Sequence, residues 1–150
     1  MPQASPVIKR PASASLYAVP PPFDCSWWIG GRGAAWVQVA GELDLATSPQ
    51  LRETLGEAER AARLVVLDLR ELSFIASSGV HVILDAAGDA RCKGGRLLIV
   101  RGPAQVDRML KLADVGMQVL TLDLDRHFEA NRAPVEANRA PGRVRSTSRR

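Results

Sequence analysis

The sequence predicts one α/β domain built on a mixed, mostly parallel sheet of about four to five strands with helices packed against it. The prediction rests first on helix and strand signals that alternate through about 100 central residues. It rests also on two continuous apolar runs, Leu64–Leu67 and Leu97–Val100, which are typical of parallel strands covered on both faces. A length of 150 residues, 46% of them hydrophobic, suits a single domain with its own core.

A β-hairpin is expected at the start of the domain. Strand patterns at Trp27–Ile29 and Ala35–Ala40 flank Gly30–Gly33, and glycines between two strands favour a tight turn. Trp27 and Trp28 are neighbours in a strand, so their side chains point to opposite faces of the sheet. We therefore expect one of the two to be exposed and to contribute to a partner surface.

Three helices are expected to alternate with the later strands. The first has Thr47 or Ser48 as its N-cap, carries Pro49 in its first turn and extends to Ala62. The second begins with Ser77 as its cap. The remaining boundaries are Gly94–Gly95 for the end of the second helix, Val106–Ala113 for the third helix and Val119–Leu122 for the last strand.

The two ends of the chain differ in composition from its centre. Six of the ten prolines lie in the first 22 residues, and residues 1–25 are expected to form a disordered leader. Residues 129–150 contain two copies of a seven-residue repeat and an arginine-rich end, and they are expected to be a disordered tail. The folded domain is therefore expected at residues 26–128.

The net charge of +4 is concentrated at these two ends. Residues 129–150 carry +4, residues 1–26 carry +1 and residues 27–128 carry −1. An arginine-rich tail can bind nucleic acid through phosphate contacts. The tail has no interleaved aromatic residues and no recognition-helix motif, so a solubilising tail is the default expectation. A basic nucleic-acid-binding accessory protein remains an alternative.

Composition excludes several other classes of protein. Cys25 and Cys92 are too few for a disulfide framework and, with His81 and His127, lack the spacing of a zinc site. No apolar run approaches the roughly 18 residues that span a bilayer. The N-terminus has no apolar segment typical of a secretory signal. We therefore expect a cytoplasmic protein with reduced thiols and no cofactor.

Two segments carry a more specific pattern than apolar periodicity. Val39–Ser48 contains Gly41-Glu42-Leu43-Asp44, and Leu64–Val80 ends in Phe74-Ile75-Ala76-Ser77-Ser78-Gly79-Val80. In this order, and about 30 residues apart, they resemble the STAS domain, the fold of the anti-sigma factor antagonists. The resemblance covers residues 26–128 and implies a STAS-like sheet with helices packed against it.

The resemblance implies a partner-switching module in transcription regulation and signal transduction. Members of the family bind an anti-sigma factor that is also a serine kinase, which releases the sigma factor. Phosphorylation of the first serine of Ser-Ser-Gly breaks that complex, and on this chain that residue is Ser77. The implied partner-binding residues are Gly41, Glu42, Leu43, Asp44, Thr47, Ala76, Ser77, Ser78 and Gly79.

The chain departs from the family pattern at Ala76, where the family usually has aspartate. A carboxylate there could hydrogen-bond the loop, orient the serine hydroxyl or be read by the kinase. We therefore expect partner binding and leave phosphorylation of Ser77 open. A constitutive antagonist, or a divergent paralogue with another partner, is the alternative.

Elementary physics agrees with a switch at Ser77 independently of the resemblance. A serine that opens a helix lies at the positive end of the helix dipole, beside free backbone amides. A phosphate there adds about −1.5 to −2 charges at neutral pH, which a helix N-terminus tolerates. A partner docked over the same position meets this new charge, so binding weakens without a large rearrangement.

A serine hydrolase that uses Ser77 is the enzymatic alternative. Ser77 and His81 lie four residues apart, and the order strand, serine, helix is shared with the nucleophile elbow of hydrolases. Ile75 occupies the position of the elbow's first glycine, and His81 is expected to pair with Asp85 or to face solvent. We therefore predict a binding module without catalytic activity.

Three carboxylates near strand ends invite an acid–base or magnesium interpretation. Glu42, Asp44 and Asp68 are the residues concerned. No further residue is placed to complete a set of converging ligands, and no phosphate-cradling loop accompanies them. Acids that follow strands are usually turn formers. We therefore predict no metal site.

Overall fold

The computed structural model describes residues 22–124, and the rest of the expected leader and tail lies outside these residues. Within residues 22–124, five strands and three α-helices are connected by short turns, with 3-10 turns at Gly31–Gly33 and Val115–Met117. The strands are β1 (Asp24–Ile29), β2 (Ala35–Leu43), β3 (Leu64–Ile75), β4 (Arg96–Val100) and β5 (Leu120–Leu122). The helices are α2 (Ser48–Ala61), α3 (Ser77–Cys92) and α4 (Ala104–Leu112).

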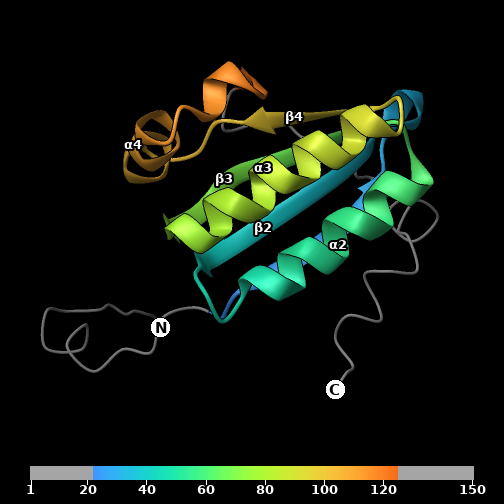
Figure 1. Cartoon of the computed structure of the whole chain (residues 1–150). Helices are drawn as coiled ribbons and strands as arrows, with labels where there is room; N and C mark the ends of the chain where they lie inside the picture. Colours follow the sequence, from blue (N-terminus) through green and yellow to red (C-terminus); the bar gives the residue numbers. More distant parts are fainter. Residues whose placement is uncertain (1–21, 125–150) are drawn as a thin grey trace, which may run out of the picture.

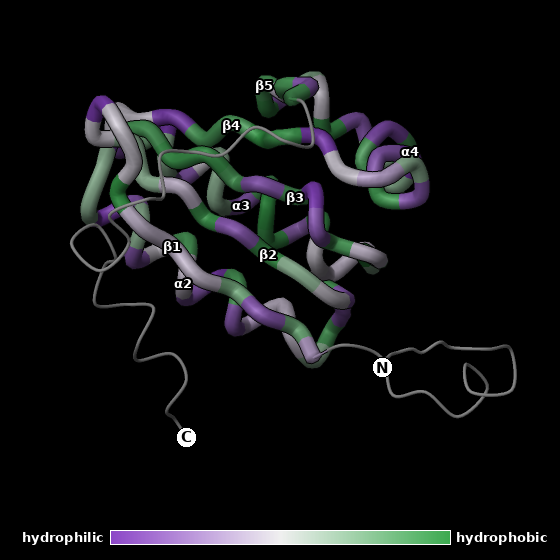
Figure 2. Tube along the Cα trace, turned by 180° about the vertical axis from the view of Figure 1, so that it is seen from behind, coloured by the Kyte–Doolittle hydropathy of each residue, from purple (hydrophilic) through white to green (hydrophobic). Residues whose placement is uncertain are grey.

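The strands form one sheet in the order β1-β2-β3-β4-β5. The hairpin pair β1–β2 is antiparallel, and every later neighbour is parallel. Helices α2 and α3 cover one face of the sheet (Figure 1), and the view from behind shows the strands in front of them (Figure 2). The predicted fold class, a single mixed and mostly parallel α/β domain, is confirmed.

The core lies between the sheet and these two helices. Alternate residues of the central strands point toward the helices, which is why the strands are wholly buried on that face. Leu51, Leu55 and Ala58 recur at helical spacing and place one stripe of α2 against the sheet. The sheet residues with no exposed surface beneath the helices include Val37, Val39, Val65, Leu67 and Ile99.

Strand β3 is much longer than its apolar run predicts. It continues to Ile75, and its later residues still pair with β2 after two register shifts. Asp68 therefore lies inside the strand and not in a turn, so the prediction of Asp68 as a turn former was wrong. Its buried carboxylate is held by Arg70, whose Nε and Nη2 donate at 2.9 and 2.7 Å. Among residues 22–124 no cluster of three potential metal ligands occurs.

Both tryptophans of β1 are buried, so the expectation that one is exposed was wrong. Trp27 is 5% exposed in the core, and its Nε1 donates to Glu57 Oε1 on α2 at 3.2 Å. Trp28 is 6% exposed and pairs across the hairpin with Trp36. Such aromatic cross-strand pairs stabilise a sheet, and they remove Trp28 as a candidate partner contact.

In the described part of the chain, no helix has the length and apolar character needed to cross a bilayer.

Candidate functional site

The two motif segments meet at the carboxyl ends of β2 and β3. Leu43 pairs with Ile75 in the parallel register, and the Ala76 amide donates to the Leu43 carbonyl oxygen at 2.8 Å. The turn that follows β2 and the start of α3 therefore lie side by side. The carboxyl ends of parallel strands are the usual place for function in an open α/β sheet.

Ser77 is the first residue of α3 and is exposed. The N-cap is Ala76, whose backbone is extended (φ −95°, ψ 169°) and whose carbonyl accepts from the amides of Gly79 and Val80. The prediction of Ser77 as the cap was therefore wrong by one residue, because Ser77 is already helical. No described residue hydrogen-bonds the Ser77 hydroxyl, which leaves that hydroxyl open to solvent and to a partner.

The start of α3 presents two free donors. The backbone amides of Ser77 and Ser78 have no acceptor among residues 22–124, and Ala76 has no side-chain oxygen to cap them. These amides and the helix dipole make a positive site next to the Ser77 hydroxyl. The local electrostatics can therefore accept an anionic group on Ser77 without breaking the helix.

A hydrogen-bonded turn around Asp44 forms the opposite wall of the site. Asp44 Oδ1 accepts from the amides of Ala46 and Thr47 at 3.0 and 3.1 Å. The Asp44 amide in turn donates to Thr47 Oγ1 at 2.9 Å. Thr47 holds the predicted N-cap position of α2, but its side chain bonds the turn rather than the helix amides. Three hydrogen bonds thus close the turn on itself.

Ser48 connects this turn to α3 and was not among the predicted site residues. Its Oγ donates to the Asp44 carbonyl oxygen at 2.6 Å and lies 3.3 Å from Ser78 Oγ. The buried Ser48 hydroxyl therefore ties the starts of α2 and α3 together. Its candidacy as the N-cap of α2 was the only sequence signal, and an N-cap assignment does not reveal a contact 30 residues away.

Three of the predicted partner-binding residues are buried and lie beneath the surface of the site, namely Gly41, Leu43 and Gly79. Gly41 and Leu43 are the last part of β2 rather than a loop, and Leu43 has no exposed surface. A Cβ on Gly79 would lie 2.6 Å from the Leu43 side chain, so glycine is needed for α3 to approach β2 this closely. The predicted residues with accessible surface are Glu42, Asp44, Thr47, Ala76, Ser77 and Ser78.

A groove opens between α2 and α3 beside Ser77, with a volume of about 460 Å³. At one side Arg52 and Asp85 form an ion pair at 3.1 Å, so Asp85 pairs with Arg52 and not with His81. His81 is exposed, and no hydrogen bond joins it to Ser77 in the described residues. The lining residues are Leu45, Ser48, Pro49, Arg52, Glu53, Ser78, His81 and Val82.

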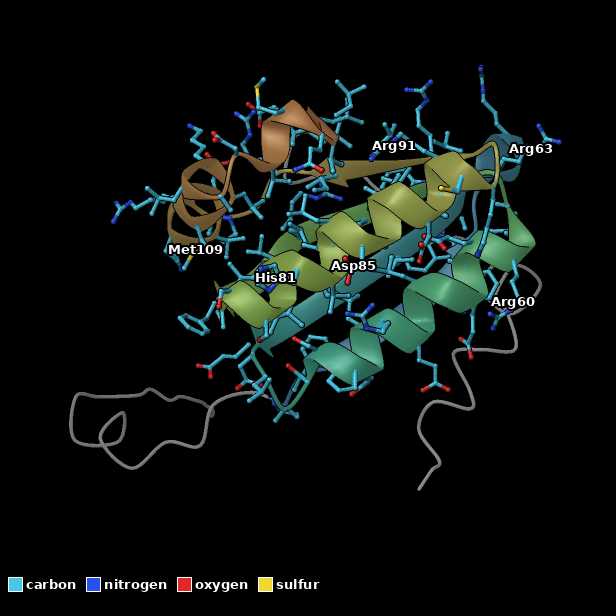
Figure 3. All side chains as sticks on the ribbon, viewed as in Figure 1. Arg60, Arg63, His81, Asp85, Arg91 and Met109 are labelled. Atoms are coloured by element: carbon cyan, nitrogen blue, oxygen red, sulfur yellow. The ribbon has the colours of Figure 1, made fainter. Side chains whose placement is uncertain are left out.

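Charge is unevenly distributed along the molecule. Exposed Glu42, Glu53 and Glu71 surround the Ser77 end, and none has an ion-pair partner among residues 22–124. Figure 3 shows Arg60, Arg63 and Arg91 toward the opposite end from His81. The exposed cations gathered at that opposite end are Arg32, Arg60, Arg63, Arg91, Lys93 and Arg96.

Comparison with known proteins identifies the family. Residues 31–128 match the STAS domain. The anti-sigma F factor antagonist of Paenibacillus polymyxa is 36% identical over 84 residues, which span 55% of this chain and 72% of that protein. The family match includes the motif segments at Gly41–Asp44 and Phe74–Gly79.

Solved structures give the same answer for the fold. The anti-sigma factor antagonist SpoIIAA in its unphosphorylated form has a TM-score of 0.58 and 21% identity, covering 70% of this chain and 90% of that chain. The phosphorylated form of the Bacillus protein has a TM-score of 0.55 and 19% identity, covering 77% and 98%. The family match and the shared fold together show that this chain belongs to the STAS domain family.

Proposed function

We propose that this chain is an anti-sigma factor antagonist. It binds an anti-sigma factor of the serine-kinase type in the cytoplasm and thereby releases the sigma factor, without catalysing a reaction itself. The observation that carries the proposal is the exposed Ser77 hydroxyl at the start of α3, beside the Asp44 turn. The relative from Paenibacillus polymyxa, which is named an anti-sigma F factor antagonist, supports it.

The structure favours Ser77 over Ser78 as the phosphorylated residue. Ser77 is exposed, and no described residue bonds its hydroxyl, whereas Ser78 is half-buried and contacts Ser48. A kinase must reach the acceptor oxygen in line with the γ-phosphoryl group of ATP. Transfer to Ser77 Oγ releases ADP and the hydroxyl proton, and it requires no rearrangement of the helix.

Phosphorylation at Ser77 acts on the interface rather than on the fold. The phosphate is stabilised by the free amides of α3, but a docked partner must bury a group with about two negative charges. It also lies in a neighbourhood that already contains Glu42 and Asp44. Burying a charge without a matched partner is strongly unfavourable, so the complex dissociates.

The charge at position 77 tests the proposal directly. Ser77→Glu is expected to weaken binding to the serine-kinase anti-sigma factor at least about tenfold, because about 1.4 kcal/mol corresponds to a factor of ten and a carboxylate would be buried. Ser77→Ala is the matched control and is expected to bind within about twofold of the unmodified chain. Isothermal titration calorimetry measures both. An unchanged dissociation constant for Ser77→Glu would overturn the assignment.

Incubation with the same kinase and ATP tests the modification itself. Mass spectrometry is expected to find one phosphate, on Ser77. A complex that forms while Ser77 stays unmodified would instead identify a constitutive antagonist, in which Ala76 has removed a contact that the kinase requires.

A further inference from the structure

We propose that the groove between α2 and α3 receives one apolar side chain from a positively charged segment of the anti-sigma factor. This inference rests on the proposed function and adds a second contact beside Ser77. The groove lies within one helical turn of Ser77, because Ser78 and His81 form part of its wall. It is therefore continuous with the surface that the partner covers.

The groove has the character of an anchor pocket. Leu45 stands at its edge with 78% of its surface exposed, and Val82 contributes a buried apolar wall with 3% exposed. Pro49 adds a rigid apolar surface at the start of α2. An exposed large apolar residue next to a concave apolar pocket is typical of protein contact surfaces, where one buried side chain contributes much of the affinity.

The ion pair between Arg52 and Asp85 limits the length of the groove. It joins α2 to α3 at 3.1 Å, one turn beyond His81. Beyond it the space between the helices shrinks to about 40 Å³, lined by Gly56, Glu59 and Ala86 among others. The volume of about 460 Å³ on the Ser77 side exceeds that of one large side chain, so it has room for the anchoring side chain and for the partner backbone that carries it. The ion pair closes the space beyond, so a continuous helix face does not fit.

The charges around the groove indicate which residues should flank the apolar side chain of the partner. Glu53 lines the groove, is exposed and has no ion-pair partner among the described residues, and Glu42 lies on the adjoining strand end. Arg52 is the one lining cation of fixed charge, and Asp85 neutralises it. An apolar side chain next to lysine or arginine therefore complements the groove, while an acidic neighbour would be repelled.

The groove also explains why position 77 controls binding. The contact between Ser48 Oγ and Ser78 Oγ joins the starts of α2 and α3 at the groove, directly beside Ser77. A side chain seated in the groove brings the partner's backbone over Ser77, so a phosphate there and the anchored partner compete for the same space. Disrupting the groove should therefore weaken binding of the partner even when Ser77 is unmodified.

The test compares two leucines of almost equal exposure. Leu45→Asp places a charge at the groove, whereas Leu112→Asp makes the same change at a site with 76% exposure at the end of α4, outside the groove. Binding of each full-length variant to the purified serine-kinase anti-sigma factor is measured by calorimetry, with circular dichroism to confirm folding. Leu45→Asp is expected to weaken binding at least about tenfold and Leu112→Asp by less than about twofold.

A charge reversal at the groove supplies the second arm. Glu53→Lys is expected to weaken binding about three- to tenfold at low salt, and the loss should shrink in high salt. Equal affinity of Leu45→Asp and Leu112→Asp would overturn the groove while leaving the function of Ser77 intact. Failure of the unmodified chain to bind any serine-kinase anti-sigma factor would overturn the proposed function, and the groove occupant with it.

Discussion

Ala76 occupies the position at the start of α3 where a short polar side chain could accept a hydrogen bond from the helix amides. An aspartate at this position, as the STAS family usually has, would be placed to cap the helix. In this chain the methyl group of Ala76 leaves the Ser78 amide without an acceptor among the described residues. The absence of the aspartate therefore alters helix stability as well as any contact with a kinase.

Restoring the aspartate should stabilise the domain. Ala76→Asp is expected to raise the free energy of unfolding by about 1 kcal/mol, since a capping side chain and a negative charge at the helix N-terminus are both favourable. Urea unfolding followed by circular dichroism measures the change. Ala76→Ser, which caps without charge, separates the two contributions. Unchanged stability in both variants would mean that a side-chain oxygen at position 76 does not cap α3.

The one-residue error in the cap of α3 shows what single residues reveal and what they do not. A serine before an apolar stripe is the usual capping signal, so Ser77 was the natural choice. The extended backbone of Ala76 goes with the hydrogen bond that its amide donates to the Leu43 carbonyl oxygen in the neighbouring strand. Such a tertiary contact leaves no trace in local sequence, and the Ser48–Ser78 contact was missed for the same reason.

At the scale of elements, α2 and α3 enclose a carboxylate between them. The Glu59 side chain is only 6% exposed, and Lys93 Nζ lies 3.7 Å from its Oε1. Its Oε2 has no hydrogen-bond partner among the described residues. Burial raises the pKa of the Glu59 carboxyl above its ordinary value of 4.5, with nearby Asp89 adding to the effect and Lys93 opposing it. The folded chain therefore holds this proton more tightly than the unfolded chain.

This shift predicts a definite pH dependence of stability. Because the folded-state pKa of Glu59 is raised, its stabilising contribution is fully present below about pH 4.5 and is lost as the pH rises through the folded value. Glu59→Gln is expected to flatten that part of the curve of unfolding free energy against pH. Glu53→Gln, on the exposed side of α2, is the control for the same substitution at a carboxylate that is not buried. Parallel curves for Glu59→Gln and the unmodified chain would contradict this account.

The elements themselves were predicted well where their pattern is local. Apolar spacing located α2, α3, α4 and the last strand to within about two residues. The second half of β3 was missed because Arg70 and Glu71 interrupt its apolar run. Pairing with β2 and the internal bond between Asp68 and Arg70 keep that half extended. These are tertiary effects that a periodicity argument does not contain.

At the scale of the whole molecule, composition concealed the separation of charge. Residues 27–128 carry a net charge of only −1, which predicts a nearly neutral domain. The fold gathers unpaired glutamates at the Ser77 end. Six exposed cations lie at the opposite end, where α2 and α3 end, β1 turns into β2 and β4 begins. Net charge counts residues but not their positions, so only the three-dimensional arrangement reveals this polarity.

The polarity predicts that association with the anti-sigma factor depends on salt. Raising ionic strength from about 0.05 to 0.5 M should slow association about tenfold or more while changing dissociation much less, since screening acts before contact. Stopped-flow fluorescence of the buried tryptophans, or of a label on exposed Cys92, measures both rates. A salt-independent association rate would show that the glutamates around Ser77 do not face the partner.

The separation of charge has a further consequence for the moments before contact. A body that is negative at one tip and positive at the other experiences a torque in the field of a cationic protein, and it rotates as it diffuses. The end that carries Ser77 would turn toward the partner, and the end that carries Arg60, Arg63 and Arg91 would turn away from it. A larger fraction of collisions would then occur in the orientation that leads to binding. The arginines at the remote tip could thus hasten complex formation without ever touching the protein that is bound.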